Sequence, residues 1–267
     1  MRMPPRNVQV NAAGISPNAA TAQPNPHARL WLFDFDNTIA HLEPEVDWAA
    51  GRRELEAYLR AAGVANEIFV EIPKGNLPLY ERLRVRLSGF AGFQSGAARE
   101  AWGANGEILL RDASAIIEHY ELAGIDRAEA AHGAIELLSA LVSRGATIAI
   151  VTSNSSRTVS RWLQIHHASE LVSTIVGRDT LLGLKPSPAM VIEAMRRFGA
   201  DAQEVVFVGD STADFGAAQA AEIGFYGIAT APPRRDRLAA SGARTIFASP
   251  AALATYLNLT GPSSFRS

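Results

Sequence analysis

Short runs of apolar residues, each ending at a polar turn, recur along the chain. The first of these runs, Leu30–Phe33, ends at Asp34. Further runs cover Thr147–Val151, Leu171–Val176 and Val205–Val208, and shorter ones lie near Gly224–Ile228 and Arg244–Phe247. A continuous apolar run of this length is typical of a strand that is buried on both faces. We therefore expect a sheet with both faces covered.

Stretches with helical spacing alternate with these predicted strands. The α/β pattern resumes at Ala134 with a predicted helix. Another helix is predicted after the Val205–Val208 strand, as far as about Glu222, and further helices are predicted over 155–165, 188–198 and 250–257. Pro188 and Pro250 are expected in the first turn of their helices, where a missing N–H costs nothing. Alternation of strands and helices predicts an α/β fold, with a Rossmann-like parallel sheet between two layers of helices.

Residues 45–131 have a different character, with helical patterns over 46–59 and 109–122 and no strand rhythm. The simplest interpretation is an inserted α-helical cap domain at 45–131. The α/β core would then consist of residues 29–44 and 132–258. Residues 1–28 are rich in Pro, Asn, Ala and Gln and are expected to form a disordered tail. Residues 259–267 are expected to form a C-terminal tail.

Composition narrows the choice of function. The 267 residues are 48% hydrophobic and 19% charged, as in a packed globular protein, and the net charge of -2 offers no footprint for nucleic acid or anionic lipid. The absence of Cys excludes disulfides, thiolate metal sites and a Cys nucleophile. No apolar run approaches the roughly 18–20 residues of a membrane span, and no secretory signal is visible. We expect a cytoplasmic protein without nucleic-acid or membrane partners; its oligomeric state cannot be read from the sequence.

Two acids follow the first predicted strand. Side chains alternate along a strand, so Asp34 and Asp36 are expected to point the same way. Two neighbouring carboxylates repel each other unless a cation or a proton lies between them. Two solvated acids at a strand end are the alternative interpretation of this segment alone.

Donors and a lysine follow later strands. Thr152, Ser153 and Asn154 come after the second strand and just before a helix, where hydroxyl and N–H groups can bind an anion. An ordinary helix N-cap uses the same residue types. Lys185 is one of two lysines among 25 basic residues, and Pro186 fixes the chain direction after it.

A last acid pair follows the Val205–Val208 strand. Asp210 is expected at the strand end, and Asp214 one helical turn later, so both can face one site. All four segments fall at the carboxyl ends of parallel strands, where open α/β sheets bind ligands. Together they supply a nucleophile, a second acid, an anion cradle, a cation and a metal-binding acid pair.

These segments, read as DFDNT from Asp34, the strand end at Thr152, Lys185 and GDSTAD to Asp214, closely resemble the haloacid dehalogenase superfamily, in its capped, phosphoglycolate phosphatase-like branch. The resemblance implies that Asp34 is the nucleophile and that Asp36 is the acid/base. It implies a phosphate-binding set and a set of Mg²⁺ ligands. The first set is Thr152, Ser153, Asn154 and Lys185; the second is Asp34, Asp36 through its backbone carbonyl, Asp210 and Asp214. Asn37 stands where a Gly is often found.

The expected activity is hydrolysis of a small phosphate monoester. Mg²⁺ and Lys185 would neutralise charge at the phosphoryl oxygens, and Mg²⁺ suits an all-oxygen site. Asp36 suits a leaving alcohol, and its role requires a raised pKa and hence burial beneath the cap. His41 and Lys74 are candidate substrate contacts, although a surface lysine is the simpler interpretation of Lys74. A phosphomutase and a non-catalytic phosphate-binding module stay open as alternatives, and the substrate is not readable.

Overall fold

A computed structural model describes residues 22–73, 75–90 and 96–259. Most of the two predicted tails, and the candidate contact Lys74, lie outside the described residues. No helix within the described ranges is long and apolar enough to cross a membrane.

Six parallel strands form the main sheet of the described chain, in the order β5-β4-β1-β6-β7-β8. Their bounds are β1 Leu30–Phe33, β4 Thr147–Val151, β5 Thr174–Val176, β6 Val205–Gly209, β7 Gly224–Ile228 and β8 Ile246–Phe247. Strand β1 lies in the middle, between β4 and β6, and all four of its residues are buried. The predicted α/β fold class is therefore confirmed.

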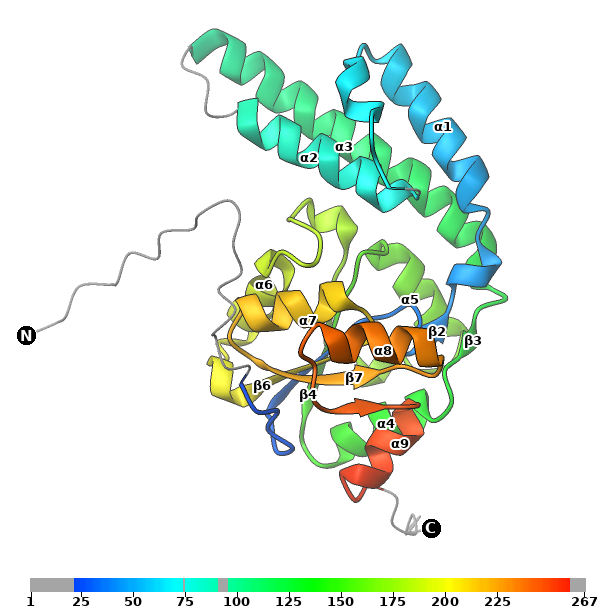
Figure 1. Ribbon diagram of the computed structural model, residues 1–267, viewed down its shortest axis with the longest axis vertical. Coiled ribbons are helices and arrows are strands. Elements are labelled where there is room, and N and C mark those ends of the chain that lie inside the picture. The colour runs from blue at the N-terminus through cyan, green and yellow to red at the C-terminus, as the bar shows by residue number, and fades with distance from the viewer. Residues whose placement is uncertain (1–21, 74, 91–95, 260–267) are drawn as a thin grey trace, which may run out of the picture.

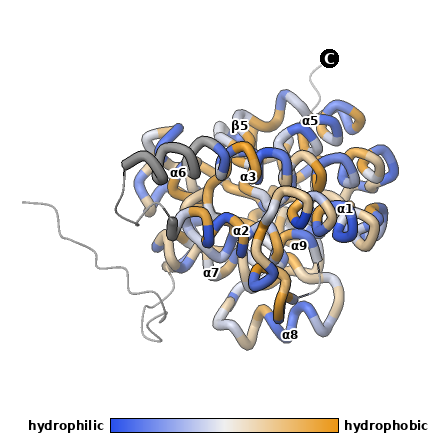
Figure 2. Tube along the Cα trace, turned by 90° about the horizontal axis from the view of Figure 1, so that it is seen from above, coloured by the Kyte–Doolittle hydropathy of each residue, from blue (hydrophilic) through white to orange (hydrophobic). Residues whose placement is uncertain are grey.

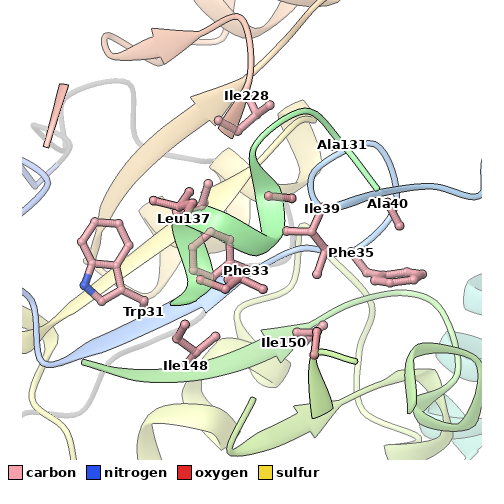
Figure 3. Close-up of a cluster of buried hydrophobic side chains, with 14 of the residues drawn as sticks. Trp31, Phe33, Phe35, Ile39, Ala40, Ala131, Leu137, Ile148, Ile150 and Ile228 are labelled. Atoms are coloured by element: carbon pink, nitrogen blue, oxygen red, sulfur yellow. The ribbon is translucent and has the colours of Figure 1, made fainter. Parts of the chain in front are cut away.

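Helices cover both faces of this sheet (Figure 1). One face packs against α4 Ala134–Ser143, α5 Ser156–Ile165 and α9 Pro250–Tyr256. The other packs against α6 Ala189–Phe198, α7 Thr212–Ala220 and α8 Pro232–Ala240. Figure 3 shows the first of these cores, where Trp31 and Phe33 of β1 lie beside Ile148 and Ile150 of β4, with Leu137 of α4. Alternate residues of each strand enter opposite cores, which explains why the strands read as continuous apolar runs.

Three helices form a separate layer above the sheet (Figure 1). They are α1 Trp48–Ala61, α2 Asn76–Phe90 and α3 Gly96–Ile125, and we call them the helical layer. In α1, Asp47 accepts a hydrogen bond from the N–H of Ala50 as the N-cap, and Gly51, Leu55 and Leu59 form the buried face. Helix α3 packs against both α1 and α2, and its later turns pack against α5 of the core.

A small antiparallel pair, β2 Ala40–His41 and β3 Glu129–Ala130, lies where the chain enters and leaves the helical layer. This pair could not be predicted from the sequence, because two-residue strands carry no periodicity. Short 3-10 turns at 43–45, 66–69, 169–171, 178–180 and 202–204 complete the described elements.

Two further predictions need correction, and one helix was not predicted. The strand expected from Leu171 begins at Thr174, because residues 169–171 form a 3-10 turn. Helix α6 begins at Ala189, with Pro188 one position earlier as the N-cap residue. Helix α8 was not predicted at all, because few of its residues are apolar. Figure 2 shows α8 at the rim of the molecule, with hydrophilic positions along much of its length.

Candidate active site

The strand tips bring the predicted residues to one edge of the sheet. Asp34 follows β1, and its backbone N–H donates to the carbonyl of Val208 in β6 at 2.8 Å. Thr152 follows β4 and Asp210 follows β6, on either side of β1. Since neighbouring parallel strands end together, these three residues share one edge, as expected for a ligand site in an open α/β sheet.

Three carboxylates meet at this edge. Ligand oxygens of Asp34, Asp210 and Asp214 lie within 4.8 Å of one another, and all three residues are buried. Burial raises the pKa of Asp34 to about 6, although Lys185 opposes the rise. Burial, and then the charge of Asp214, raises the pKa of Asp210 to about 8. Ionised acids this close are unfavourable without positive charge between them, so the cluster fits a cation.

Lys185 supplies positive charge from the loop before α6. Its Nζ lies 2.5 Å from Oδ1 of Asp34 and 2.5 Å from Oδ1 of Asp214, and it donates to the carbonyl of Val151 at 3.2 Å. Burial alone would lower the pKa of Lys185, but the charges of Asp214 and Asp34 outweigh burial and raise it. Lys185 is therefore a permanent cation beside the candidate nucleophile.

Asp214 lies behind the cluster and also fixes the local backbone. Its Oδ2 accepts hydrogen bonds from the N–H groups of Asp210 at 3.2 Å and Ser211 at 2.9 Å, and from the Ser211 hydroxyl at 2.6 Å. Ser211 in turn caps α7 by accepting from the N–H of Asp214. Asp214 thus holds the strand-to-helix turn that carries Asp210.

Asp36 lies outside the carboxylate cluster. Its Oδ1 accepts from the backbone N–H of Leu42 at 2.9 Å and of Glu43 at 3.0 Å, which fixes the carboxyl group at the cavity wall. Burial raises the pKa of Asp36 to about 7, more than those two hydrogen bonds lower it. The direction of this shift is the one that an acid/base role of Asp36 requires.

The backbone conformation after Asp36 explains why asparagine suits position 37. The φ of Asn37 is 61°, in the left-handed region that glycine and asparagine adopt most readily. The Asn37 side chain donates to Glu43 at 2.9 Å, and Thr38 donates to Oδ2 of Asp34 at 3.3 Å. Asparagine can therefore replace glycine at this position without changing the turn.

The loop after β4 has separate capping and cavity residues. Ser155, and not Thr152, is the N-cap of α5, where its hydroxyl accepts from the N–H of Thr158 at 3.1 Å. Thr152, Ser153 and Asn154 line the cavity. The side-chain amide of Asn154 donates to Glu121 at 3.0 Å, so this group is turned away from the role of an anion donor.

A cavity of about 540 Å³ lies over these residues. Its floor includes Asp34, Thr152 and Lys185, and the helical layer contributes Trp48, Leu77, Pro78 and Glu81. His41 does not line it; instead, His41 lies in β2 opposite Glu129. The structure therefore does not bring His41 to the site.

Two arginines, Arg234 and Arg237, and two glutamates, Glu43 and Glu81, line the cavity but were not predicted from the sequence. Arg234 of α8 contacts Oδ2 of Asp210 through Nη1, and its Nη2 lies 3.3 Å from Glu43. Arg237, one turn later, also lines the cavity. Pro232 and Pro233 could have indicated a helix start, but nothing in the sequence places α8 beside the end of β6.

Comparison with known proteins decides the family. A family model described as haloacid dehalogenase-like hydrolase matches residues 94–228, which contain Thr152, Lys185, Asp210 and Asp214. The chain belongs to the haloacid dehalogenase-like hydrolase family. Membership confirms the resemblance drawn from the sequence. The match begins after Asp34, so the family assignment does not depend on the first acid pair.

Relatives of this hydrolase match a larger share of the chain than the family model does. A phosphoglycolate phosphatase of Pseudomonas putida is 28% identical over 205 residues, which cover 77% of this chain and 71% of the relative. A phosphoglycolate phosphatase of Rhodospirillum rubrum is 26% identical over 235 residues, covering 86% and 91%. These findings confirm the expected enzyme class, a hydrolase of the phosphatase kind.

Two solved structures share the fold of this hydrolase. One, described as a predicted phosphoglycolate phosphatase from Haemophilus somnus, has a TM-score of 0.56 at 22% identity, and the match covers 86% of this chain and 98% of the other. The other, described as a "putative beta-phosphoglucomutase" from Thermotoga maritima, has a TM-score of 0.56 at 21% identity, and the match covers 87% of this chain and 100% of the other. At this identity the likeness concerns the fold alone.

Proposed function

We propose that this hydrolase cleaves a small phosphate monoester with the help of Mg²⁺. Asp34 is the nucleophile, Asp36 is the acid/base, and the reaction passes through an aspartyl-phosphate. The helical layer, within residues 45–131, is the cap domain of this enzyme, and the enzyme works in the cytoplasm.

One observation carries this proposal. Asp34 lies at the floor of the cavity between Lys185 and Asp210, while Asp36, with a pKa near 7, stands at the same cavity. A carboxylate with a cation beside it can attack a phosphoryl group, and a carboxyl with a pKa near 7 can both give and take a proton at neutral pH.

The residues present fit a hard divalent cation. Asp34, Asp210 and Asp214 offer only oxygen ligands, and the backbone carbonyl of Asp36 is the further ligand that the family resemblance implies. Mg²⁺ prefers such ligands. When bound, it would neutralise charge on the phosphoryl oxygens and so favour attack by an anion.

The first chemical step forms a bond between a carboxylate oxygen of Asp34 and the phosphorus. The bond from phosphorus to the leaving oxygen breaks, and the electron pair goes to that oxygen. Asp36 donates its proton there, so the alcohol leaves neutral. Lys185 compensates the negative charge of the phosphoryl group, with Thr152 and Ser153 as hydrogen-bond donors to its oxygens.

The second step reverses the proton transfer. The Asp36 carboxylate takes a proton from a water molecule, whose oxygen attacks the phosphorus of the aspartyl-phosphate. The bond from phosphorus to Asp34 breaks, and inorganic phosphate leaves with both side chains restored. A single residue with a pKa near neutrality can serve both steps, because each step returns it to the state that the other needs.

The leaving group would lie against the helical layer. Trp48, Leu77 and Pro78 give this side of the cavity an apolar surface, while Glu81 adds a carboxylate that is paired with Arg84 at 2.6 Å. The named activity of the relatives makes phosphoglycolate the first ester to test. A sugar phosphate and a nucleotide are the next two.

The experiment is a phosphate-release assay over a metabolite panel with Mg²⁺. Asp34→Asn should abolish turnover, and Asp36→Asn should lower kcat by about 10²–10⁴. Asp236→Asn, which changes an exposed acid of α8 that does not line the cavity, should leave the rate unchanged. An unchanged rate in EDTA would contradict the metal requirement, and full activity of Asp34→Asn would contradict the nucleophile.

Product analysis separates the phosphatase from a phosphomutase of the same fold. Isomerisation of a sugar phosphate without net release of phosphate would identify a mutase. A non-catalytic module would release none from any ester on the panel and would give no product.

A further inference from the structure

A buried ion pair joins α3 to the loop at the candidate phosphate site. Arg178, in the turn after β5, donates from Nη1 to Oε1 of Glu121 at 2.7 Å and from Nη2 to Oε2 at 3.2 Å. Glu121 belongs to the last turns of α3, and both side chains are 0% exposed. Neither residue belongs to the four segments that carry the family resemblance.

Besides pairing with Arg178, Glu121 also holds the start of α5. Its carboxylate accepts from the side-chain amide of Asn154 at 3.0 Å, from the N–H of Ser155 at 3.1 Å and from the hydroxyl of Thr158 at 3.1 Å. Three donors in the loop and the first turn of α5 therefore share one carboxylate, which belongs to the helical layer.

Arg178 holds the same loop through the backbone. Its Nη1 donates to the carbonyl of Ser153 at 2.7 Å, and its own N–H donates to the carbonyl of Asn154 at 2.9 Å. In a trans peptide the C=O and N–H point in opposite directions. The bond to Ser153 therefore turns the N–H of Asn154 away from Arg178, where Thr152 Oγ1 accepts from it at 3.2 Å.

Ser114 aims the guanidinium from the other side. Its hydroxyl accepts from Nε of Arg178 at 3.1 Å, and its carbonyl accepts from Nη2 at 3.3 Å. Ser114 lies two turns before Glu121 on α3. The planar guanidinium of Arg178 therefore donates to two residues of α3, Ser114 and Glu121, and to the carbonyl of Ser153 in the loop. A lysine ammonium cannot reproduce this planar arrangement of donors.

The charge balance of the pair also matters for phosphate. A lone Glu121 carboxylate behind an anion-binding loop would repel a phosphate dianion, and Arg178 neutralises it. A fully buried ion pair is seldom the most stable filling of a protein core, since apolar side chains of the same volume often do as well. The ion pair between Glu121 and Arg178 therefore matters less for stability than for the single conformation in which it holds the neighbouring loop.

We propose that Glu121 and Arg178 are positioning residues, which hold the Thr152–Asn154 loop in the geometry that binds the phosphoryl group and make that geometry depend on α3. This inference rests on the proposed phosphatase function. Neither residue touches the substrate; both act through the loop, from the side opposite the cavity.

The test measures binding of inorganic phosphate to the Mg²⁺-loaded full-length protein by calorimetry, together with kcat and KM. Arg178→Lys keeps the charge and loses the fork, and Glu121→Gln keeps the shape and loses the charge. We expect each variant to bind phosphate at least 10-fold more weakly and to lose about 100-fold in kcat/KM, as for a misplacement near 1 Å. The melting temperature is recorded for each variant, and activity is expressed per folded molecule.

Ser114→Ala is the gentler variant, because it removes one hydroxyl and leaves the ion pair intact. It should weaken phosphate binding a few-fold without unfolding the protein. If the charged variants fail to fold, this variant still tests the positioning role of Glu121 and Arg178. Asp126→Asn with Arg161→Gln is the matched control. That pair joins the end of α3 to α5 through two 3.0 Å bonds at the surface and should leave phosphate binding unchanged.

The outcomes separate this inference from the proposed function. Wild-type affinity for phosphate in Ser114→Ala and in the folded charged variants would overturn the positioning role. Loss of affinity in the Asp126 and Arg161 control as well would also overturn it, by indicating a general effect of the contact between α3 and α5. A wild-type protein that binds phosphate but hydrolyses no ester would contradict the phosphatase and leave the binding comparison valid.

Discussion

The guanidinium of Arg234 contacts the carboxylate of Asp210, and so positive charge from α8 reaches one of the three acids of the cluster. A second bond, from Nη2 to Glu43 at 3.3 Å, holds the arginine over the cavity. A divalent cation bound by Asp210 would need the same carboxylate. Arg234 and the cation therefore compete for Asp210.

The first prediction concerns this competition. Arg234→Gln should bind Mg²⁺ or Mn²⁺ more tightly than the wild type, because the cation no longer displaces a paired arginine. The pair is half-buried, and removing an ion pair of this kind is worth about 1 kcal/mol, or roughly 5-fold in Kd. Titration calorimetry, or the Mn²⁺ signal in electron paramagnetic resonance, gives the Kd.

Arg235→Gln is the control for that measurement. It removes the same charge from the neighbouring position of α8, where the side chain is exposed and does not line the cavity. Its Kd should equal that of the wild type. Equal affinities in all three proteins would show that Arg234 does not compete with the cation.

Asp210 could be predicted as a site residue from the sequence, whereas Arg234 could not. Asp210 was found because the Val205–Val208 run predicts a buried strand, and a parallel strand must end at the ligand-binding edge. Asp34 and Thr152 were found in the same way. Each of these residues follows a predicted buried strand, and parallel strands end at the ligand-binding edge of the sheet. Its position in the sequence is therefore enough to predict that it lies at the site.

Arg234, Glu121 and Arg178 could not be found in this way. Their roles depend on which surfaces pack together, and a charged residue in a helix is ordinarily exposed. Glu121 and Arg178 are 57 residues apart and buried at a junction of two layers. A sequence shows the charge of such residues but not their burial, so it cannot separate them from the many surface arginines and glutamates.

The second prediction concerns the pH dependence of turnover. The first step needs protonated Asp36, whose pKa burial raises to about 7. The value of kcat/KM should therefore fall as pH rises through an apparent pKa of about 7 or lower, since a bound Mg²⁺ favours the carboxylate. In Asp36→Asn the residual rate should lose this alkaline limb. A limb that persists unchanged in Asp36→Asn would assign it to another group.

The third prediction concerns stability without metal. Burial raises the pKa of Asp36 to about 7 and of Asp210 to about 8, from ordinary values of 3.8. The folded state then binds more protons than the unfolded state between about pH 4 and 8. The contribution of these two groups to stability is full below this window and is lost as pH rises through it.

Urea denaturation in EDTA measures this loss as a midpoint that declines from pH 4 to pH 8. Saturating Mg²⁺ should flatten the decline, because the cation stabilises the ionised carboxylates. Asp36→Asn keeps the acceptor oxygen for the N–H groups of Leu42 and Glu43 but cannot titrate, so its midpoint should decline less than that of the wild type. A midpoint that rises with pH would reverse the assigned sign.

The last prediction separates two acids that lie in one cluster and meet the same lysine. For Asp34, burial outweighs the attraction of Lys185 and raises its pKa to about 6, so at pH 8 the carboxylate is ionised but less stable in the folded protein than in the unfolded chain. Asp34→Asn should therefore raise the free energy of unfolding at pH 8 in EDTA, while it abolishes activity, as is common when an active-site charge is removed. Asp214→Asn should do the opposite. Oδ2 of Asp214 accepts three hydrogen bonds from Asp210 and Ser211, and Oδ1 pairs with Lys185 in a side chain that is 1% exposed. An asparagine amide has only one acceptor oxygen for both roles, so the substitution should cost about 1–3 kcal/mol. Chemical denaturation of the two variants beside the wild type measures both changes, and destabilisation by Asp34→Asn as large as that by Asp214→Asn would mean that Asp34 also serves the fold.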